Sequence, residues 1–458
     1  MNGKVSLQCL GAAKTVTGSK HLLRTPELNI LIDCGLFQGI KSLRLKNREP
    51  LPVDVSDIRI LLLTHAHLDH TGYIPLLVKN GFKGKILMTP PTRDLTELIL
   101  RDSAKIQEED AERANRNGYS KHKPAMPLYT EQDVEEALNY FETHNDEEWL
   151  TLSKNIKFRY RKNGHILGSA FIEIECYGKK ILFSGDFGRR ISEILDPPSV
   201  IREADYLIME STYGNRLHDP APPEEHLARV INNTIHKQGN LLIPSFAVGR
   251  AQEVMLMINK LKEERKIPDI PVYLDTPMGA DATDILCRYT EWHKLSDHQC
   301  MDIWNNITIN RESKRTIAII NQRGSKIIIA ASGMLTGGRV LEYLEHYVGD
   351  KRNTILLAGY QAEGTRGRAL EEGAHEIKMH GRYYPIKAEV EEITSLSAHG
   401  DQKEMLDWMK NIETKPKGIF LIHGESNALE AFRVKIKDEI QVEAVIPNQY
   451  EEIELFKL

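Results

Sequence analysis

The stretch LLLTHAHLDHTGYIP, Leu61–Pro75, places three histidines and one aspartate within six residues, directly after an apolar run. His65 and His67 are two residues apart, so on an extended segment their side chains point the same way and converge on one metal ion. Asp69 and His70 follow on the next turn and reach a second position. Neutral imidazole and carboxylate are the ligands that zinc takes when thiolates are absent, and burying such groups without partners costs several kcal/mol each. The stretch therefore predicts a metal site at the end of a buried strand.

Four ligands do not fill two metal positions, and further candidates stand at the ends of other apolar runs. These candidates are His165 in KNGHILGSA, Asp186 in LFSGDFG, His423 in FLIHGES and Asp33 in LIDCG. Each is expected at the carboxyl end of a strand, where a crevice collects residues that are far apart in the chain. A lone histidine at a strand end more often bonds to the backbone than to a metal, but the combination with HxHxDH favours metal binding.

The bulk composition is that of a globular protein with a large core. The chain has 458 residues, of which 41% are hydrophobic and 27% charged, so two or three structural units are expected. The formal net charge of -5 argues against bulk attraction to a polyanion but leaves a local basic cleft open. Five scattered cysteines without a CxxC pair indicate neither a disulfide framework nor a thiolate zinc site. Without a signal-peptide pattern or an apolar run of about 18–20 residues, we expect a soluble, cytoplasmic protein.

Strands and helices alternate most regularly between residues 212 and 390. Helices are predicted near 222–237, 249–265, 279–290 and 338–347, each followed or preceded by a short apolar strand. This alternation predicts βαβ crossovers and a mostly parallel sheet. Earlier in the chain a helix is predicted near 130–143. The charged residues 101–123 are expected to form a solvated helix and loop, with a flap that contacts substrate as the alternative.

At this point the chain resembles a known family. The series Asp33, His65-x-His67-x-Asp69-His70, His165 and Asp186 is similar to the signature of the metallo-β-lactamase superfamily. That superfamily is an αββα sandwich with a two-metal site at one edge.

Three further residues resemble motifs of the β-CASP branch of that superfamily, which acts on nucleic acids: Glu210 in MESTYG, His399 in SLSAHGD and His423 in IHGE. The resemblance implies an α/β fold in which the sandwich is interrupted by an inserted β-CASP domain on a mostly parallel sheet. The implied boundaries are 1–211 and 391–458 for the sandwich, and 212–390 for the insertion.

The resemblance also implies a role for each site residue. The first metal would be held by His65, His67, His165 and Asp186, and the second by Asp69, His70, Asp186 and His423. Asp186 would bridge the two ions, and Asp33 would orient ligand histidines. Two zinc ions are the expected cofactors, with manganese as the alternative.

The implied reaction is hydrolysis of RNA phosphodiester bonds by a hydroxide held between the two metals. Asp69 would take the proton of the nucleophilic water, and His399 would donate to the phosphate or to the leaving oxygen. Glu210 would orient His399 and keep it protonated. The expected activity is endonucleolytic, with 5′→3′ exonucleolytic cleavage as a further expectation, and it leaves 5′-phosphate and 3′-hydroxyl ends. The expected partner is single-stranded RNA, and a homodimer is expected by analogy with relatives.

Three glycine-bearing loops after strands are candidates for phosphate contacts: IPSFAVGRAQEV, AASGMLTGGRVLEYL and GYQAEGTRGRAL. The candidate RNA-binding residues in these loops are Ser245, Arg250, Ser332, Gly333, Thr336, Arg339 and Arg366. A glycine loop between strand and helix is otherwise only a tight turn. The basic stretch RESKRTIAIINQRGSK is expected either to extend the track or to form a solvated face.

Three alternatives stay open. The first is a DNA-processing nuclease of the same family. The second is a small-molecule hydrolase, such as a lactonase or thioesterase, with the same two-metal site; the large insertion argues against it. The third is a non-catalytic RNA-binding protein, which the complete ligand set disfavours.

Overall fold

The computed structural model describes residues 3–118 and 122–458. The chain forms two compact units, which are described separately below. Unit 1 consists of Met1–Leu217 together with His399–Leu458, and unit 2 consists of His218–Ala398. Of the charged segment predicted over 101–123, residues 119–121 lie outside the described residues, and the part up to residue 117 is helical.

Unit 1 contains two mixed sheets of seven strands each. The first has the order β22 (Glu452–Lys457), β1 (Lys4–Cys9), β2 (His21–Arg24), β3 (Asn29–Ile32), β4 (Ile58–Leu62), β5 (Lys85–Met88), β6 (Phe141–Thr143). The second has the order β21 (Ala444–Val445), β20 (Gly418–Ile422), β11 (Tyr206–Glu210), β10 (Lys179–Phe183), β9 (Ala170–Cys176), β8 (Ile156–Lys162), β7 (Leu150–Ser153).

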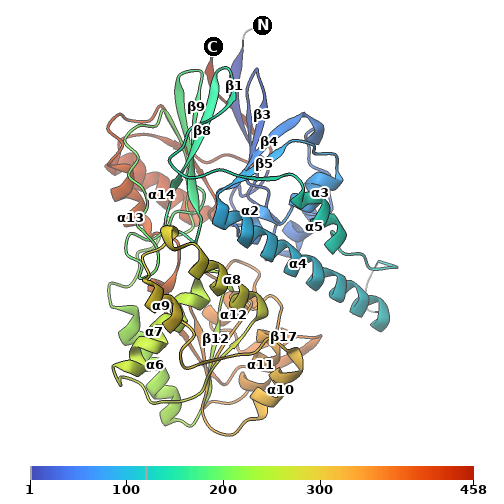
Figure 1. Ribbon diagram of the computed structural model, residues 1–458, viewed down its shortest axis with the longest axis vertical. Helices are drawn as coiled ribbons and strands as arrows, with labels where there is room; N and C mark the ends of the chain where they lie inside the picture. Colours follow the sequence, from blue (N-terminus) through green and yellow to red (C-terminus); the bar gives the residue numbers. More distant parts are fainter. Residues whose placement is uncertain (1–2, 119–121) are drawn as a thin grey trace. The chain divides into compact units, whose positions relative to one another are not determined.

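The inner faces of the two sheets share one core. Ile32 and Leu62 from the first sheet pack in the same buried cluster as Phe158, Ile172 and Ile208 from the second. Helices cover the outer faces: α3 (Ile74–Lys79), α4 (Pro90–Asn117) and α5 (Glu131–Leu138) lie on the first sheet, and α13 (Gln402–Met409) and α14 (Ser426–Glu439) on the second (Figure 1). The predicted αββα sandwich is confirmed.

Unit 2 is built on a six-stranded sheet in which every described pairing is parallel. Its order is β14 (Ile307–Ile309), β13 (Val272–Asp275), β15 (Ile327–Ala330), β12 (Leu241–Pro244), β16 (Thr354–Leu357), β19 (Glu389–Glu392). The connecting helices are α6 (Pro223–His236), α7 (Arg250–Glu263), α8 (Pro277–Arg288), α9 (Asp297–Asp302), α10 (Ser313–Asn321), α11 (Val340–Tyr347) and α12 (Arg366–Glu371). A separate hairpin is formed by β17 (Glu376–Met379) and β18 (Arg382–Pro385). The predicted parallel sheet is confirmed.

The helix predicted near 130–143 is too long. α5 ends at Leu138, and Phe141 begins strand β6, which pairs in parallel with β5 through Ile86 and Phe141. Pairing with a neighbouring strand overrides the local helical pattern here, as tertiary contacts often do at element ends. Nowhere in residues 3–118 and 122–458 is a helix long and apolar enough to span a membrane.

Candidate metal centre

The predicted site residues meet at the carboxyl ends of strands in unit 1. Asp33 follows β3 and His65 follows β4 in the first sheet, while Asp186 follows β10 and His423 follows β20 in the second. Because β10, β11 and β20 are parallel neighbours, their carboxyl ends lie at one edge of the sheet. Asp33 and His423 have φ angles of 58° and 48°, in the left-handed region that non-glycine residues seldom adopt. Such outliers cluster at functional sites.

Three imidazoles and one carboxylate form the first cluster. His67 Nδ1 lies 3.1 Å from His65 Nε2 and 3.2 Å from His165 Nε2. Asp186 Oδ2 lies 3.5 Å from Nε2 of both His65 and His165. Burial, with the neighbouring His70, holds the pKa of His65 well below its usual value, and burial lowers the pKa of His67 to about 4. These rings are therefore neutral near pH 7 and offer lone pairs to one point.

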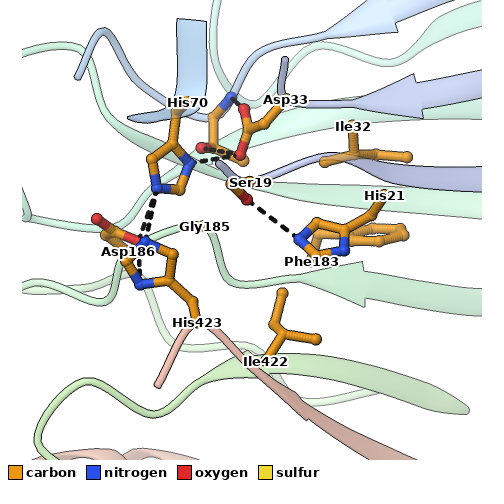
Figure 2. Close-up of a pocket in the computed structure, with 11 residues that line it drawn as sticks. Ser19, His21, Ile32, Asp33, His70, Phe183, Gly185, Asp186, Ile422 and His423 are labelled. Carbon is orange, nitrogen blue, oxygen red and sulfur yellow. Dashed lines mark hydrogen bonds and ion pairs between the residues drawn. The ribbon is translucent and has the colours of Figure 1, made fainter. Parts of the chain in front are cut away.

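The second cluster joins Asp69, His70 and His423. His423 Nε2 lies 3.2 Å from His70 Nε2 and 3.3 Å from Asp69 Oδ2, and His70 Nε2 lies 3.7 Å from Asp69 Oδ2. Figure 2 shows the ring of His70 between Asp33 on one side and His423 on the other. His70 and His423 are 353 positions apart in the chain, yet their side chains are in contact.

Asp186 faces both clusters. Its Oδ2 is directed to the first cluster, while its Oδ1 lies 3.2 Å from His70 Nε2 in the second. Burial alone would raise the pKa of Asp186, but His423, His70 and His65 lower it well below its usual value. Burial would likewise lower the pKa of His70, but the carboxylates of Asp186, Asp33 and Asp69 raise it well above its usual value. The site thus concentrates negative charge where a cation would be bound most strongly.

His399 and Glu210 form a separate pair beside the clusters. His399 Nδ1 lies 2.9 Å from Glu210 Oε1, and its Nε2 is 3.9 Å from Asp186 Oδ2. Glu210 is fully buried and also accepts the main-chain N–H groups of Phe187 (2.6 Å) and Thr212 (3.0 Å). Burial alone would lower the pKa of His399, but Glu210, together with Asp186 and Asp69, raises that pKa to about 9. His399 is therefore protonated at neutral pH.

Side chains behind the clusters orient the histidines. Asp33 accepts a hydrogen bond from His70 Nδ1 at 2.7 Å and from the Thr64 hydroxyl at 2.8 Å. The Thr212 hydroxyl lies 3.2 Å from His423 Nδ1. The two threonines are functional candidates that the sequence interpretation missed. The only signal for Thr64 is its place between the strand and the first histidine, and for Thr212 its place two residues after Glu210.

The donor set fits zinc. Zinc–nitrogen bonds of about 2.0–2.1 Å in a tetrahedron hold ligand atoms about 3.3 Å apart, close to the 3.1 and 3.2 Å between the imidazole nitrogens of the first cluster. Imidazole and carboxylate are zinc ligands, and the ligand atoms of each cluster lie within 4.8 Å of one another. The structure thus brings together all seven residues that were predicted as ligands, and His399 and Glu210 lie next to them.

The residues predicted to bind RNA lie in unit 2, and several of their polar groups have partners within the protein. Arg339 Nη1 lies 2.7 Å from the buried carboxylate of Asp275, at the end of β13. Arg366 donates to the main-chain carbonyls of Lys378 and Leu335, and Arg250 pairs with Glu253.

Smaller groups occupy the same loops. The Ser332 hydroxyl accepts the Thr336 N–H at 3.0 Å, which closes the loop after β15, and a Cβ at Gly333 would meet the ring of Phe246 at 2.7 Å. Ser245 is buried at the end of β12.

Comparison with known proteins gives the family. A profile described as the metallo-beta-lactamase superfamily matches residues 18–230, and the Beta-Casp domain profile matches residues 251–370. Ribonuclease TTHA0252 of Thermus thermophilus is 32% identical over 92% of this chain and 93% of its own length. The chain belongs to the metallo-β-lactamase superfamily, as a member with a β-CASP domain. The recognised signature is therefore confirmed.

Other proteins are similar along nearly the whole chain. An RNase J-like protein of Methanocaldococcus jannaschii is 35% identical over 97% of this chain and 98% of its own length. Transcription termination factor FttA of Methanosarcina mazei is 31% identical over 98% of this chain and 72% of its own length. The crystal structure of a protein of unknown function from Enterococcus faecalis V583 has a TM-score of 0.53 at 13% identity, covers 99% of this chain and 100% of its own, and supports the fold alone.

A third profile concerns the reaction. The Zn-dependent metallo-hydrolase RNA specificity domain matches residues 383–447, a segment that contains His399 and His423. With the histidine and aspartate clusters, this match makes the protein a zinc-dependent metallo-hydrolase of the β-CASP type that carries an RNA specificity domain.

Proposed function

We propose that the protein is a ribonuclease that hydrolyses single-stranded RNA, endonucleolytically and also from the 5′ end, and leaves 5′-phosphate and 3′-hydroxyl ends. The observation that carries the proposal is the His399–Glu210 pair beside two clusters that share Asp186. A metal site alone suits many hydrolases. A protonated histidine held next to it supplies the acid that a poor leaving group requires. The names of the relatives and the RNA specificity domain support RNA as the polymer.

In this proposal His65, His67, His165 and Asp186 hold one zinc ion, and Asp69, His70, His423 and Asp186 hold a second. Bound zinc lowers the pKa of water toward neutrality and neutralises charge that builds on phosphate oxygens.

Two side chains of the protein carry out the proton transfers. The Asp69 carboxylate takes the proton of the attacking water: its side chain is 17% exposed, whereas that of Asp186 is 2% exposed and surrounded by histidines. His399 Nε2–H donates its proton to the departing 3′ oxygen of the RNA. Glu210 keeps Nδ1–H of His399 engaged, so Nε2 is the nitrogen that points toward the clusters.

We further propose that RNA phosphates contact the loops at the carboxyl edge of the sheet in unit 2. Ser332, Gly333 and Thr336 form one of these loops, and Ser245 and Arg250 stand at another. Arg366 and Arg339 act there mainly by holding loop carbonyls and Asp275, which fixes the loop conformation.

The test compares 5′-labelled single-stranded RNA with single-stranded DNA of the same sequence, using protein of measured zinc content. We expect RNA to be cut to 5′-phosphate products, and His399→Ala to lose this activity while its zinc content is unchanged. Cleavage of DNA alone would favour the DNA-processing alternative. No cleavage of either polymer by zinc-loaded protein would refute the proposal and point to a small ester or thioester substrate.

A further inference from the structure

Thr64 occupies a fixed position between strand β4 and the ligand His65. It is fully buried, and its main-chain carbonyl accepts the Ala170 N–H at 2.9 Å. Gly185 lies directly against its side chain, because a Cβ added there would be 2.7 Å from Thr64 Cβ and 2.9 Å from its hydroxyl oxygen. The hydroxyl therefore has one orientation, set by packing on one side and by hydrogen bonds on the other.

The hydrogen bonds of Thr64 have a defined direction. Its main-chain N–H donates to Asp33 Oδ1 and its hydroxyl to Asp33 Oδ2, both at 2.8 Å. A carboxylate only accepts, so the single hydroxyl proton is committed to Asp33. His65 Nδ1 lies 3.0 Å from the same hydroxyl oxygen, and only His65 can donate in that contact.

A neutral imidazole carries one N–H. Since that hydrogen of His65 is on Nδ1, the lone pair is on Nε2, the nitrogen that faces His67 and Asp186. Asp33 applies the same constraint directly to His70, whose Nδ1 lies 2.7 Å from Oδ2 and whose Nε2 faces the second cluster: in the neutral ring that binds a metal ion, the hydrogen stays on Nδ1.

We propose that Thr64 is a positioning residue. Its hydroxyl donates to Asp33 and can therefore only accept from His65, which keeps the hydrogen of His65 on Nδ1. One carboxylate then selects the metal-binding tautomer of one histidine in each cluster: of His70 directly and of His65 through the Thr64 hydroxyl. The inference rests on the proposed zinc site but does not depend on the substrate. It is therefore tested through metal affinity rather than cleavage.

The first test measures zinc affinity by competition with a chromogenic chelator. Thr64→Val keeps the shape and removes the hydroxyl, and we expect binding about 10–100-fold weaker, the range typical for loss of a group that orients a ligand. Thr64→Ser restores the hydroxyl and is expected to bind zinc with nearly the affinity of the wild type. Thr234→Val is the matched control: Thr234 is also buried, and its hydroxyl bonds within unit 2 to the Val230 carbonyl and the Thr354 hydroxyl.

The second test replaces the carboxylate that sets the direction of these hydrogen bonds. In Asp33→Asn, an amide N–H directed at the Thr64 oxygen leaves the hydroxyl proton free to donate to His65 Nδ1, which places the hydrogen on Nε2. Thr64→Val should then cost much less zinc affinity in the Asp33→Asn background than in the wild type. Circular dichroism and thermal unfolding check that each variant is folded.

The possible results distinguish a failure of the role proposed for Thr64 from a failure of the metal site. Thr64→Val could reduce zinc affinity equally in the wild type and in Asp33→Asn, or Thr64→Ser could bind zinc as weakly as Thr64→Val. Either result would overturn the proposed hydrogen-bond role of Thr64 and leave packing as its role. A wild-type protein that binds no zinc would overturn the metal site itself, and with it the proposed function.

Discussion

The ion pair between Glu210 and His399 allows a quantitative prediction for Glu210→Gln. Two unit charges 2.9 Å apart attract by about 6 kcal/mol at an effective dielectric constant of about 20. Burial of His399 opposes this attraction, and the net effect raises its pKa from 6.5 to about 9, which corresponds to about 3 kcal/mol. With the Glu210 charge removed, the largest contribution that raises this pKa is lost, while Asp186 and Asp69 remain, so the pKa of His399 should fall toward 6.5.

The direction of the pH dependence of cleavage is set by which protonation state of His399 is active. If protonated His399 donates the proton, wild-type activity is present below pH 9 and is lost as the pH rises through about 9. In the variant the pH at which activity is lost shifts down toward about 6.5. At pH 8 about 90% of the wild-type histidine is protonated, against about 3% for a pKa of 6.5, so we expect a defect of up to about 30-fold that shrinks toward pH 6.

The assay is kcat/KM for cleavage of one RNA between pH 6 and 9, expressed as the ratio of variant to wild type at equal zinc content. This ratio cancels any pH dependence of the nucleophile that both proteins share. Glu173→Gln is the control, because Glu173 is a buried carboxylate of the same unit that pairs with Arg159 away from the clusters. A Glu210→Gln defect of the same size at every pH would refute the electrostatic reasoning and leave only a structural role.

Three further predictions concern metal and stability. Chelation of zinc should abolish cleavage and lower the melting temperature, since saturation at about 1,000 times Kd stabilises the folded state by about 4 kcal/mol; calorimetry with and without zinc would show this, and an unchanged melting temperature would contradict it. Arg339→Met should destabilise unit 2 by about 3–5 kcal/mol, because it leaves the buried Asp275 without its cationic partner; unchanged urea unfolding with weaker RNA binding would instead indicate direct RNA contact. Gly185→Ala should reduce both thermal stability and zinc affinity, because the new Cβ would lie 2.7 Å from Thr64 Cβ. Gly178→Ala is the control: Gly178 has a φ of 72° and no atom within 4 Å of an added Cβ, so only the free-energy cost of a positive φ in alanine is expected.

Much of the metal site could be predicted from the sequence, because strand ends and ligand spacing are local features. The separation of His65 and His67 by two residues and the apolar runs before Asp186 and His423 are visible without a structure. The strand topology then requires the ends of β10, β11 and β20 to meet. Thr64 could not be identified in this way, because its role depends on a hydrogen bond to Asp33, 31 positions away.

Other features depend on tertiary contacts that cannot be predicted from the neighbouring residues in the sequence. The chain around Phe141 continues a helical pattern, yet it pairs with β5. Arginines in glycine loops are typical of phosphate sites, but Arg339 is engaged by Asp275 and Arg366 by main-chain carbonyls. A sequence shows that an arginine is present, while its partners depend on which strands and loops the fold places beside it.

The distance in the chain between His70 and His423 also has a consequence for synthesis. Strand β20, which precedes His423, pairs with β11 and β21, so the second sheet ends at β11 until β20 is made. Ribosomes add about 5–20 residues per second, and 353 positions therefore correspond to roughly 20–70 s. The first cluster is complete once Asp186 has been made, so for the later part of that interval the nascent chain has all residues of the first cluster but lacks His423 of the second. The ribonuclease activity proposed above would therefore require translation to pass residue 423.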